Sequence, residues 1–267
     1  MKENLVHALA KIGGYLAERN TRPGLLARQL LGRDAPGDTK VSELLVNERR
    51  ARSRMDGSIA GSLVKTAWAA WEMMDLGTDG MTGGLDRLVA WTLAQVEGAS
   101  PTLDVAPVTL PNGAVFAEPA AAAFAARCLG LRVVLRARKE ARPAVARLIA
   151  QLADGPQPAT LDLSASALAA LALVPPPHRR HLDGLVQRLG KAQGATGDWP
   201  DADLFHMLEG LVLAGIRPAR AVVARAAPAL LARLGDDGGF DRNPPGDPVR
   251  EERSLIGLRA LQVALED

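Results

Sequence analysis

The sequence predicts an all-α fold in which about six helical hairpins form an inner and an outer ring within one domain, residues 1–267. Three observations support this prediction. Apolar residues recur at helical spacing, a short glycine turn recurs along the chain, and arginine-bearing helices alternate with more apolar ones. Since 48% of the residues are apolar and 23% are charged, the chain can bury one sizeable core or close a ring of repeats.

The predicted helices follow one another with turns rich in Gly, Pro, Asp and Asn between them. In chain order they cover residues 5–16, 25–31, 41–48, 62–75, 85–95, 119–134, 144–152, 164–174, 181–193, 203–214, 219–234 and 251–265. No segment shows the convincing alternation of a half-buried strand, so no strand is expected.

The second helix of a predicted pair is more uniformly apolar than the first. Residues 119–134, 164–174 and 203–214 are rich in alanine and leucine, whereas the helices before them carry more arginine and other polar residues. This asymmetry indicates that the second helices form the inner ring. Two longer connections, 97–118 and 236–251, are candidates to cover one mouth of the resulting barrel.

A polar turn with a glycine, followed by an apolar residue and then a helix, recurs in the sequence. Its clearest copy is residues 193–199, and degraded copies occupy 55–59, 110–116 and 236–240. Self-similarity at roughly 40 to 50 residues is typical of repeat proteins, in which no single unit buries its own apolar face.

The turn at Gln193, Gly197 and Trp199 resembles the QW repeat of terpenoid cyclases and protein prenyltransferase β-subunits, where Gln ends an outer helix and Gly-x-Trp follows. The other copies match this pattern loosely. The resemblance implies an α/α toroid whose inner helices enclose an isoprenoid-like apolar ligand. Fold alone does not assign a reaction, because one architecture serves many activities.

The catalytic motifs of these families are missing from the chain. Class II terpene cyclases use a DxDD motif, and the nearest segment here, Asp201-Ala202-Asp203-Leu204, lacks the last aspartate. Asp203, with Asp201 beside it, is nevertheless the candidate catalytic acid, because it begins a predicted inner helix. The alternative is that one of these aspartates caps the helix by accepting backbone N–H groups.

A metal site is not expected. Prenyltransferases hold zinc with an Asp-x-Cys pair, but Cys128 has no aspartate two residues before it and lies among apolar residues, as a packed core thiol would. Asp203, His206 and Glu209 are spaced to share one helix face, where a histidine is either a ligand or simply hydrogen-bonded. No cofactor is expected either.

Aromatic residues are few, at 3% of the chain. Trp68 and Trp71 on one predicted helix, with Phe124 and Phe205 on others, are candidates to line a ligand cavity, where aromatic faces stabilise positive charge. The alternative is that they anchor the core between the two rings.

Acidic and polar residues gather at the predicted starts of inner helices, which converge on one mouth of a toroid. Pairs such as Asp162 with Asp203, or Glu118 with Glu251, could serve as the acid and the base of an inverting glycosidase-like site. The alternative is that these acids complement the helix macrodipole.

Two function classes remain open. One is a non-catalytic toroid that binds a protein partner or an apolar isoprenoid-like molecule, and the other is a divergent cyclase or prenyltransferase with an acid at the cavity mouth. The net charge is +2 and the basic runs 49–54 and 132–147 lack stacking aromatics, so nucleic acid is not an expected partner. A single cysteine and the absence of a long apolar run favour a soluble cytoplasmic protein without a membrane span.

Overall fold

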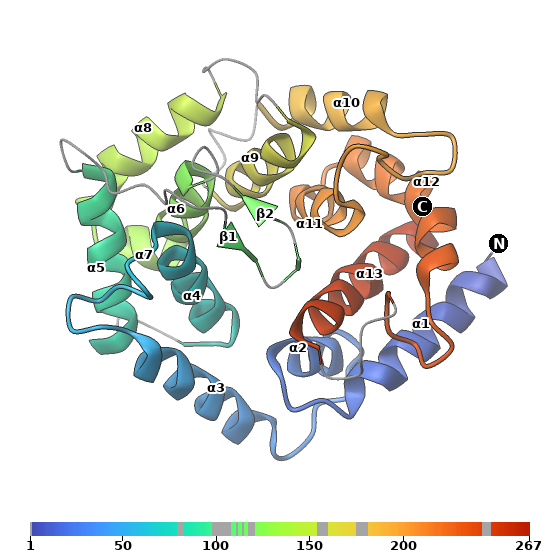
Figure 1. Ribbon diagram of the computed structural model, residues 1–267, viewed down its shortest axis with the longest axis horizontal. Helices are drawn as coiled ribbons and strands as arrows, with labels where there is room; N and C mark the ends of the chain where they lie inside the picture. The colour runs from blue at the N-terminus through green and yellow to red at the C-terminus, as the bar shows by residue number, and fades with distance from the viewer. Residues whose placement is uncertain are drawn as a thin grey trace.

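The computed structural model describes residues 2–78, 83–97, 108–110, 112–113, 115–116, 121–153, 160–174, 181–241 and 247–267. Within these residues the chain forms thirteen helices and one pair of two-residue strands (Figure 1). The predicted all-α class is confirmed.

Twelve of the thirteen helices fall into two groups that differ in burial. The more buried group lies around the middle of the molecule in Figure 1 and comprises α2 (Arg22–Leu30), α4 (Leu63–Asp75), α6 (Ala121–Leu129), α9 (Leu161–Leu173), α11 (Leu204–Ala214) and α13 (Pro248–Glu266). The peripheral group exposes one side and comprises α1 (Lys2–Ala17), α3 (Asp38–Arg52), α5 (Gly83–Glu97), α8 (Ala141–Ala153), α10 (Leu182–Ala192) and α12 (Arg217–Arg233). Contacts within the buried group run from α4 through α6, α9, α11 and α13 to α2.

Five helices of the buried group begin at a side-chain N-cap, whose oxygen accepts a hydrogen bond from a backbone N–H in the first turn. These caps are Thr21, Ser62, Thr160, Asp203 and Asp247. Since caps and apolar periodicity are local signals, the predicted helix 203–214 agrees with α11 to within one residue.

Besides shifted helix ends, the structure differs from the sequence prediction at two places. The helix expected over 119–134 ends at Leu129, and a separate helix α7 (Arg132–Ala137) follows. A Cβ on Gly130 would lie 2.6 Å from Val174 Cγ1, so the chain turns where it packs closely against the end of α9. The strands β1 (Val108–Thr109) and β2 (Val115–Phe116) were not expected, because two residues are too few to show alternation.

The four predicted turn copies share one backbone conformation. Gly57, Gly113, Gly197 and Gly238 all have a left-handed φ, between 84° and 90°. This conformation favours glycine over residues that carry a Cβ.

Three of these glycines also press against a helix of the peripheral group. A Cβ would lie 2.6 Å from Arg87 O of α5 at Gly57, 2.1 Å from Arg225 O of α12 at Gly197, and 2.3 Å from Lys11 O of α1 at Gly238. The turn therefore links the peripheral helix that precedes it to another peripheral helix: α3 to α5, α10 to α12, and α12 to the N-terminal helix α1.

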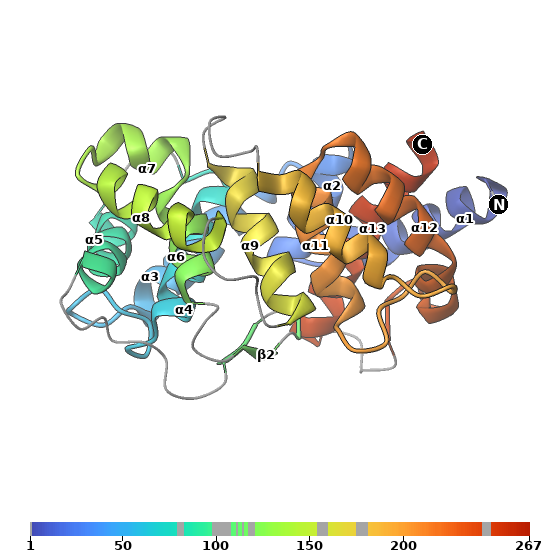
Figure 2. The same cartoon turned by 90° about the horizontal axis from the view of Figure 1, so that it is seen from above.

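The described part of the connection between α5 and α6 lies over the N-terminal ends of α11 and α13. The backbone carbonyl of Asn112 accepts a hydrogen bond from Arg253 Nε at 3.0 Å, and a Cβ on Gly113 would meet Val249. The strand β2 lies at one edge of the molecule in Figure 2. Residues 242–246 of the other long connection, 236–251, lie outside the described residues. Glu118, one of the acids paired in the sequence prediction, also lies outside them.

The helices α1 and α13 pack against each other, so both chain ends lie on the same side of the molecule (Figures 1 and 2). No helix in the described residues is both long and apolar enough to span a bilayer.

Candidate functional site

Asp203 and His206 lie together at the N-terminal end of α11. One carboxylate oxygen of Asp203 accepts from the backbone N–H of His206 at 2.9 Å, and the other accepts from Arg253 Nη2 at 2.7 Å. Asp203 is therefore the N-cap of α11 and an ion-pair partner, both of which use it as an acceptor. Asp201 is exposed and takes no part in these contacts.

Asp162 joins this group from the start of α9. Its Oδ1 accepts from the backbone N–H of Asp203 at 3.3 Å, so the structure brings together the two carboxylates that the sequence analysis paired. Glu251 accepts instead from Thr21 Oγ1, at 2.6 Å.

His206 is buried with both ring nitrogens in contact with polar groups. Nδ1 lies 3.2 Å from Asn112 Nδ2, and that same amide nitrogen donates to Glu209 Oε2 at 3.0 Å. Because the Glu209 carboxylate only accepts, it orients the amide with its N–H groups toward His206, and Nδ1 must accept. Nε2 then carries the proton and points at Ser166 Oγ (2.9 Å) and the Asp162 carbonyl (3.1 Å).

This tautomer excludes His206 as a base for Ser166, because Nε2 is the donor in that contact. Burial lowers the pKa of His206, although Glu209, Asp162 and Asp203 act in the opposite direction. The imidazole is thus held neutral by its surroundings, as a structural histidine.

We expect His206 to make the fold less stable in mild acid. Its folded-state pKa is below the ordinary value of about 6.5, so the unfolded chain binds more protons below that pH and stability falls as the pH falls. The loss between pH 7.5 and 5.5 is at most about 1.4 kcal/mol, measured by urea unfolding. His206→Gln should remove this component, whereas His7→Gln, at an exposed position of α1, should retain it. Equal pH dependence in the wild type and His206→Gln would contradict the assignment.

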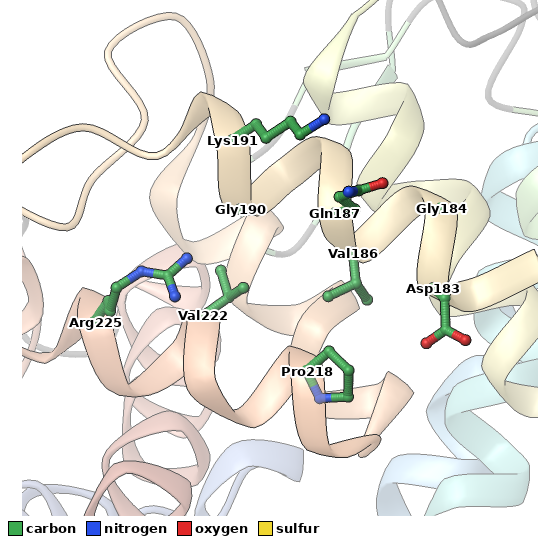
Figure 3. A pocket seen from close by; sticks show the side chains of 9 residues that line it. All are labelled: Asp183, Gly184, Val186, Gln187, Gly190, Lys191, Pro218, Val222 and Arg225. Carbon is green, nitrogen blue, oxygen red and sulfur yellow. The ribbon is translucent and has the colours of Figure 1, made fainter.

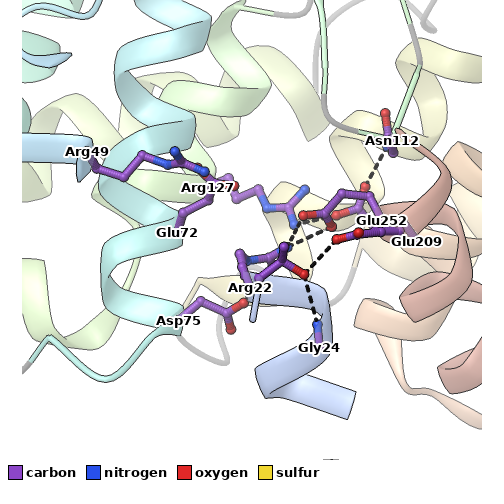
Figure 4. A network of polar contacts seen from close by, with 11 residues as sticks. Arg22, Gly24, Arg49, Glu72, Asp75, Asn112, Arg127, Glu209 and Glu252 are labelled. Carbon is purple, nitrogen blue, oxygen red and sulfur yellow. Dashed lines mark hydrogen bonds and ion pairs between the residues drawn. The ribbon is translucent and has the colours of Figure 1, made fainter. Parts of the chain in front are cut away.

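A network of buried ion pairs occupies the middle of the buried helix group (Figure 4). Arg127 of α6 binds Glu209 of α11 at 2.6 Å. Arg22 of α2 binds Glu252 of α13 at 2.7 Å and Asp75 of α4 at 2.6 Å. The helices of the buried group thus contact one another through charged as well as apolar side chains.

Burial and opposite charges act against each other on the ionisation of this network. Burial alone would raise the pKa of Glu209, but the Arg127 guanidinium holds it below its ordinary value. Burial raises the pKa of Glu252, and Arg22 offsets only part of this effect. Each carboxylate of the network thus forms an ion pair with an arginine of the protein.

Two of the aromatic candidates, Trp68 and Trp71, lie beside the arginines of this network. The Arg127 guanidinium lies 3.9 Å from the Trp71 ring centroid and 4.8 Å from that of Trp68, and Arg22 lies 4.7 Å from Trp71. Trp68 also packs against Phe124, with ring centroids 5.9 Å apart. Cations of the protein itself thus occupy the positions beside these rings where a substrate cation would be stabilised.

Phe205 contacts a separate set of residues near the start of α11. Its ring lies 5.2 Å from Phe240 in an edge-on arrangement, and the Arg253 guanidinium lies 5.1 Å from its centroid. Phe205 and Phe240 are both fully buried, so they anchor the core between α11 and the turn after α12.

A cavity of about 460 Å³ opens at the C-terminal ends of α4, α9 and α11. Its apolar lining consists of Trp71, Met74, Leu131, Leu173, Val212 and Leu213. Asp75 and Arg259 are the charged residues at its wall. Trp71 is the one residue among those proposed from the sequence that lines this cavity in the described residues.

The cavity and the His206 cluster are at opposite ends of α11. His206 lies in the first turn of the helix and Leu213 in the last, a separation of roughly 10 Å along the axis. The predicted site is at the N-terminal ends of these helices, whereas the cavity is at the C-terminal ends of α4, α9 and α11.

A second cavity, of about 680 Å³, lies between the peripheral helices α10 and α12 (Figure 3). Gly184, Val186, Pro218 and Val222 form part of its wall. Lys191 and Arg225 lie near one end, and Asp183 lies near the other (Figure 3).

The pairing of these charges across the core was not predicted from the sequence. Their signal is a charged residue within a largely apolar stretch, as for Arg127 in "AAAAFAARCLGL" and for Glu72 in "KTAWAAWEMMDLG", which binds Arg49 at 2.9 Å. Such a residue is rarely buried unless it is paired, so each one predicts a partner across the core.

The described residues contain no cluster of three His, Cys, Asp or Glu side chains arranged to hold a metal ion. Cys128 is buried, and burial raises the pKa of its thiol to about 12, so it stays protonated. No protein-family model, no curated protein and no solved structure significantly matches this chain.

Proposed function

We propose that the chain is an α/α toroid that binds a ligand in the cavity at the C-terminal ends of its inner helices and does not catalyse a reaction. The contacts that run from α4 through α6, α9, α11 and α13 to α2 support the inner ring. The recurrent glycine turns, which pack on successive peripheral helices, support the outer ring and the resemblance to terpenoid cyclases and prenyltransferases.

One observation carries the proposed function. The acidic side chains of the buried network are ion-paired within the protein, whereas the wall of the cavity is mostly apolar. Asp203 and Glu209 each bind an arginine, so they act as structural acceptors rather than proton donors. The cavity has the size and the mostly apolar wall that small-molecule sites commonly have.

The proposal predicts that the neutral apolar dye Nile Red binds in this cavity. We expect its fluorescence to rise on addition of the protein, because the dye leaves water for an apolar wall. Leu213→Trp should abolish the rise by filling the cavity. Gly184→Trp, which fills the cavity between α10 and α12 instead, is the matched control and should leave the rise unchanged.

Two results would overturn this function. Dye binding that survives Leu213→Trp would place the ligand elsewhere. Conversion of a polyprenyl diphosphate or a squalene-like substrate, lost in Asp203→Asn, would instead establish the catalytic alternative, with Asp203 as its acid.

A further inference from the structure

Arg259 differs from the other arginines of the buried helices in its surroundings. It lies on α13, is partly buried, and forms part of the cavity wall. Among the described residues it makes no ion pair and donates no hydrogen bond, whereas Arg22 and Arg127 are both paired. Burial disfavours its charged form, with Asp75 acting in the opposite direction at longer range.

The acidic residue beside Arg259 in the cavity wall, Asp75, forms an ion pair with a different arginine. Asp75 lies on the same cavity wall, and its Oδ2 binds Arg22 Nη2 at 2.6 Å. The Arg259 guanidinium therefore has no ion-pair partner among the described residues. It lies next to the apolar side chains that α4, α9 and α11 contribute to the cavity.

From this juxtaposition we infer that the cavity binds a monocarboxylate with an aliphatic tail, such as a fatty acid, and that Arg259 pairs with its carboxylate. This inference rests on the proposed binding function. Leu131, Leu173, Val212 and Leu213 provide an apolar wall for the tail. An arginine guanidinium matches a carboxylate through two parallel N–H donors.

The surroundings of the cavity also select the charge of the head group. The helices α4, α9 and α11 all end there, and helix C-termini carry partial negative charge. These partial negative charges oppose a doubly charged group more strongly than a single carboxylate. A phosphate monoester of the same chain length should therefore bind more weakly than the carboxylate.

The test is displacement of Nile Red by three compounds that share a ten-carbon tail: decanoate, 1-decanol and decyl phosphate. We expect decanoate to bind the wild type about tenfold more tightly than the alcohol, because of the charge-assisted pair. The Nile Red affinity of each variant is measured first, and relative to it Arg259→Gln should reduce decanoate affinity to that of the alcohol. Arg259→Lys should retain part of the preference, and Arg220→Gln, which alters a peripheral arginine paired with Glu266, should retain all of it.

The possible results separate this inference from the proposed function. Equal affinity for decanoate and decanol, or an undiminished preference in Arg259→Gln, would overturn the carboxylate assignment while leaving the cavity as a binding site. Tighter binding of decyl phosphate would overturn the selection for a single charge. Failure of Nile Red itself to bind would overturn the proposed function and this inference together.

Discussion

Replacement of Arg127 by methionine is expected to lower the free energy of unfolding by about 3–5 kcal/mol. The guanidinium of Arg127 is the ion-pair partner of Glu209 in the middle of the buried helices, at 2.6 Å. Removing it leaves the carboxylate with a hydrogen bond from Asn112 but without a compensating positive charge in contact. Methionine retains an apolar chain of similar length against Trp68 and Trp71, so the measured loss in urea unfolding reports mainly the charge.

Two further variants test this interpretation. Arg220→Met removes a more exposed arginine whose partner Glu266 is mostly accessible, so it should cost less than about 1 kcal/mol. Adding Glu209→Met to Arg127→Met should recover part of the loss, because no buried charge is then left without its partner. A cost below about 1 kcal/mol for Arg127→Met alone would show that the pair is not needed for stability.

Replacement of Gly197 by alanine is expected to cost about 3–4 kcal/mol, the second largest effect. Its φ of 88° already penalises any residue with a Cβ by about 1–2 kcal/mol. The added Cβ would also lie 2.1 Å from the backbone carbonyl oxygen of Arg225, which cannot rotate away as a side chain could. The turn would have to separate from α12, and that movement would break the hydrogen bond from Gln193 Nε2 to Val222 O.

Gly77→Ala is the matched control for this substitution. Gly77 has a similar φ of 82°, but no atom lies within 4 Å of the position its Cβ would take. It should therefore show only the conformational cost, about 1–2 kcal/mol. Thermal or urea unfolding of the two variants measures the difference, and equal losses would mean that the contact with α12 contributes nothing.

Local patterns in the sequence were sufficient to predict several elements of this structure. The helical period, the helix-breaking residues and the caps depend on residues three or four positions apart. They can therefore be recognised in the sequence without knowledge of the fold. Asp203 as a cap, Cys128 as a buried thiol, and a shared turn at Gly57, Gly197 and Gly238 all follow from such short-range signals.

The position of the candidate site was not predictable in this way. Hydrophobic periodicity indicates which face of a helix is buried but not which end of the helix borders a cavity. The connection that carries Asn112 reaches α11 and covers the ends where the sequence analysis placed the ligand. Side-chain packing leaves the cavity instead at Leu173, Val212 and Leu213.

Periodicity, breakers, turn glycines and caps in the amino-acid sequence thus determine where the helices lie and which of their faces are buried, because these depend on contacts within a turn or two of chain. Only the tertiary structure decides which charges meet in the interior. Arg22 and Glu252 are 230 residues apart in the chain and 2.7 Å apart in the fold. Such a pair forms only after the N-terminal and C-terminal helices have packed side by side, since no local interaction brings them together.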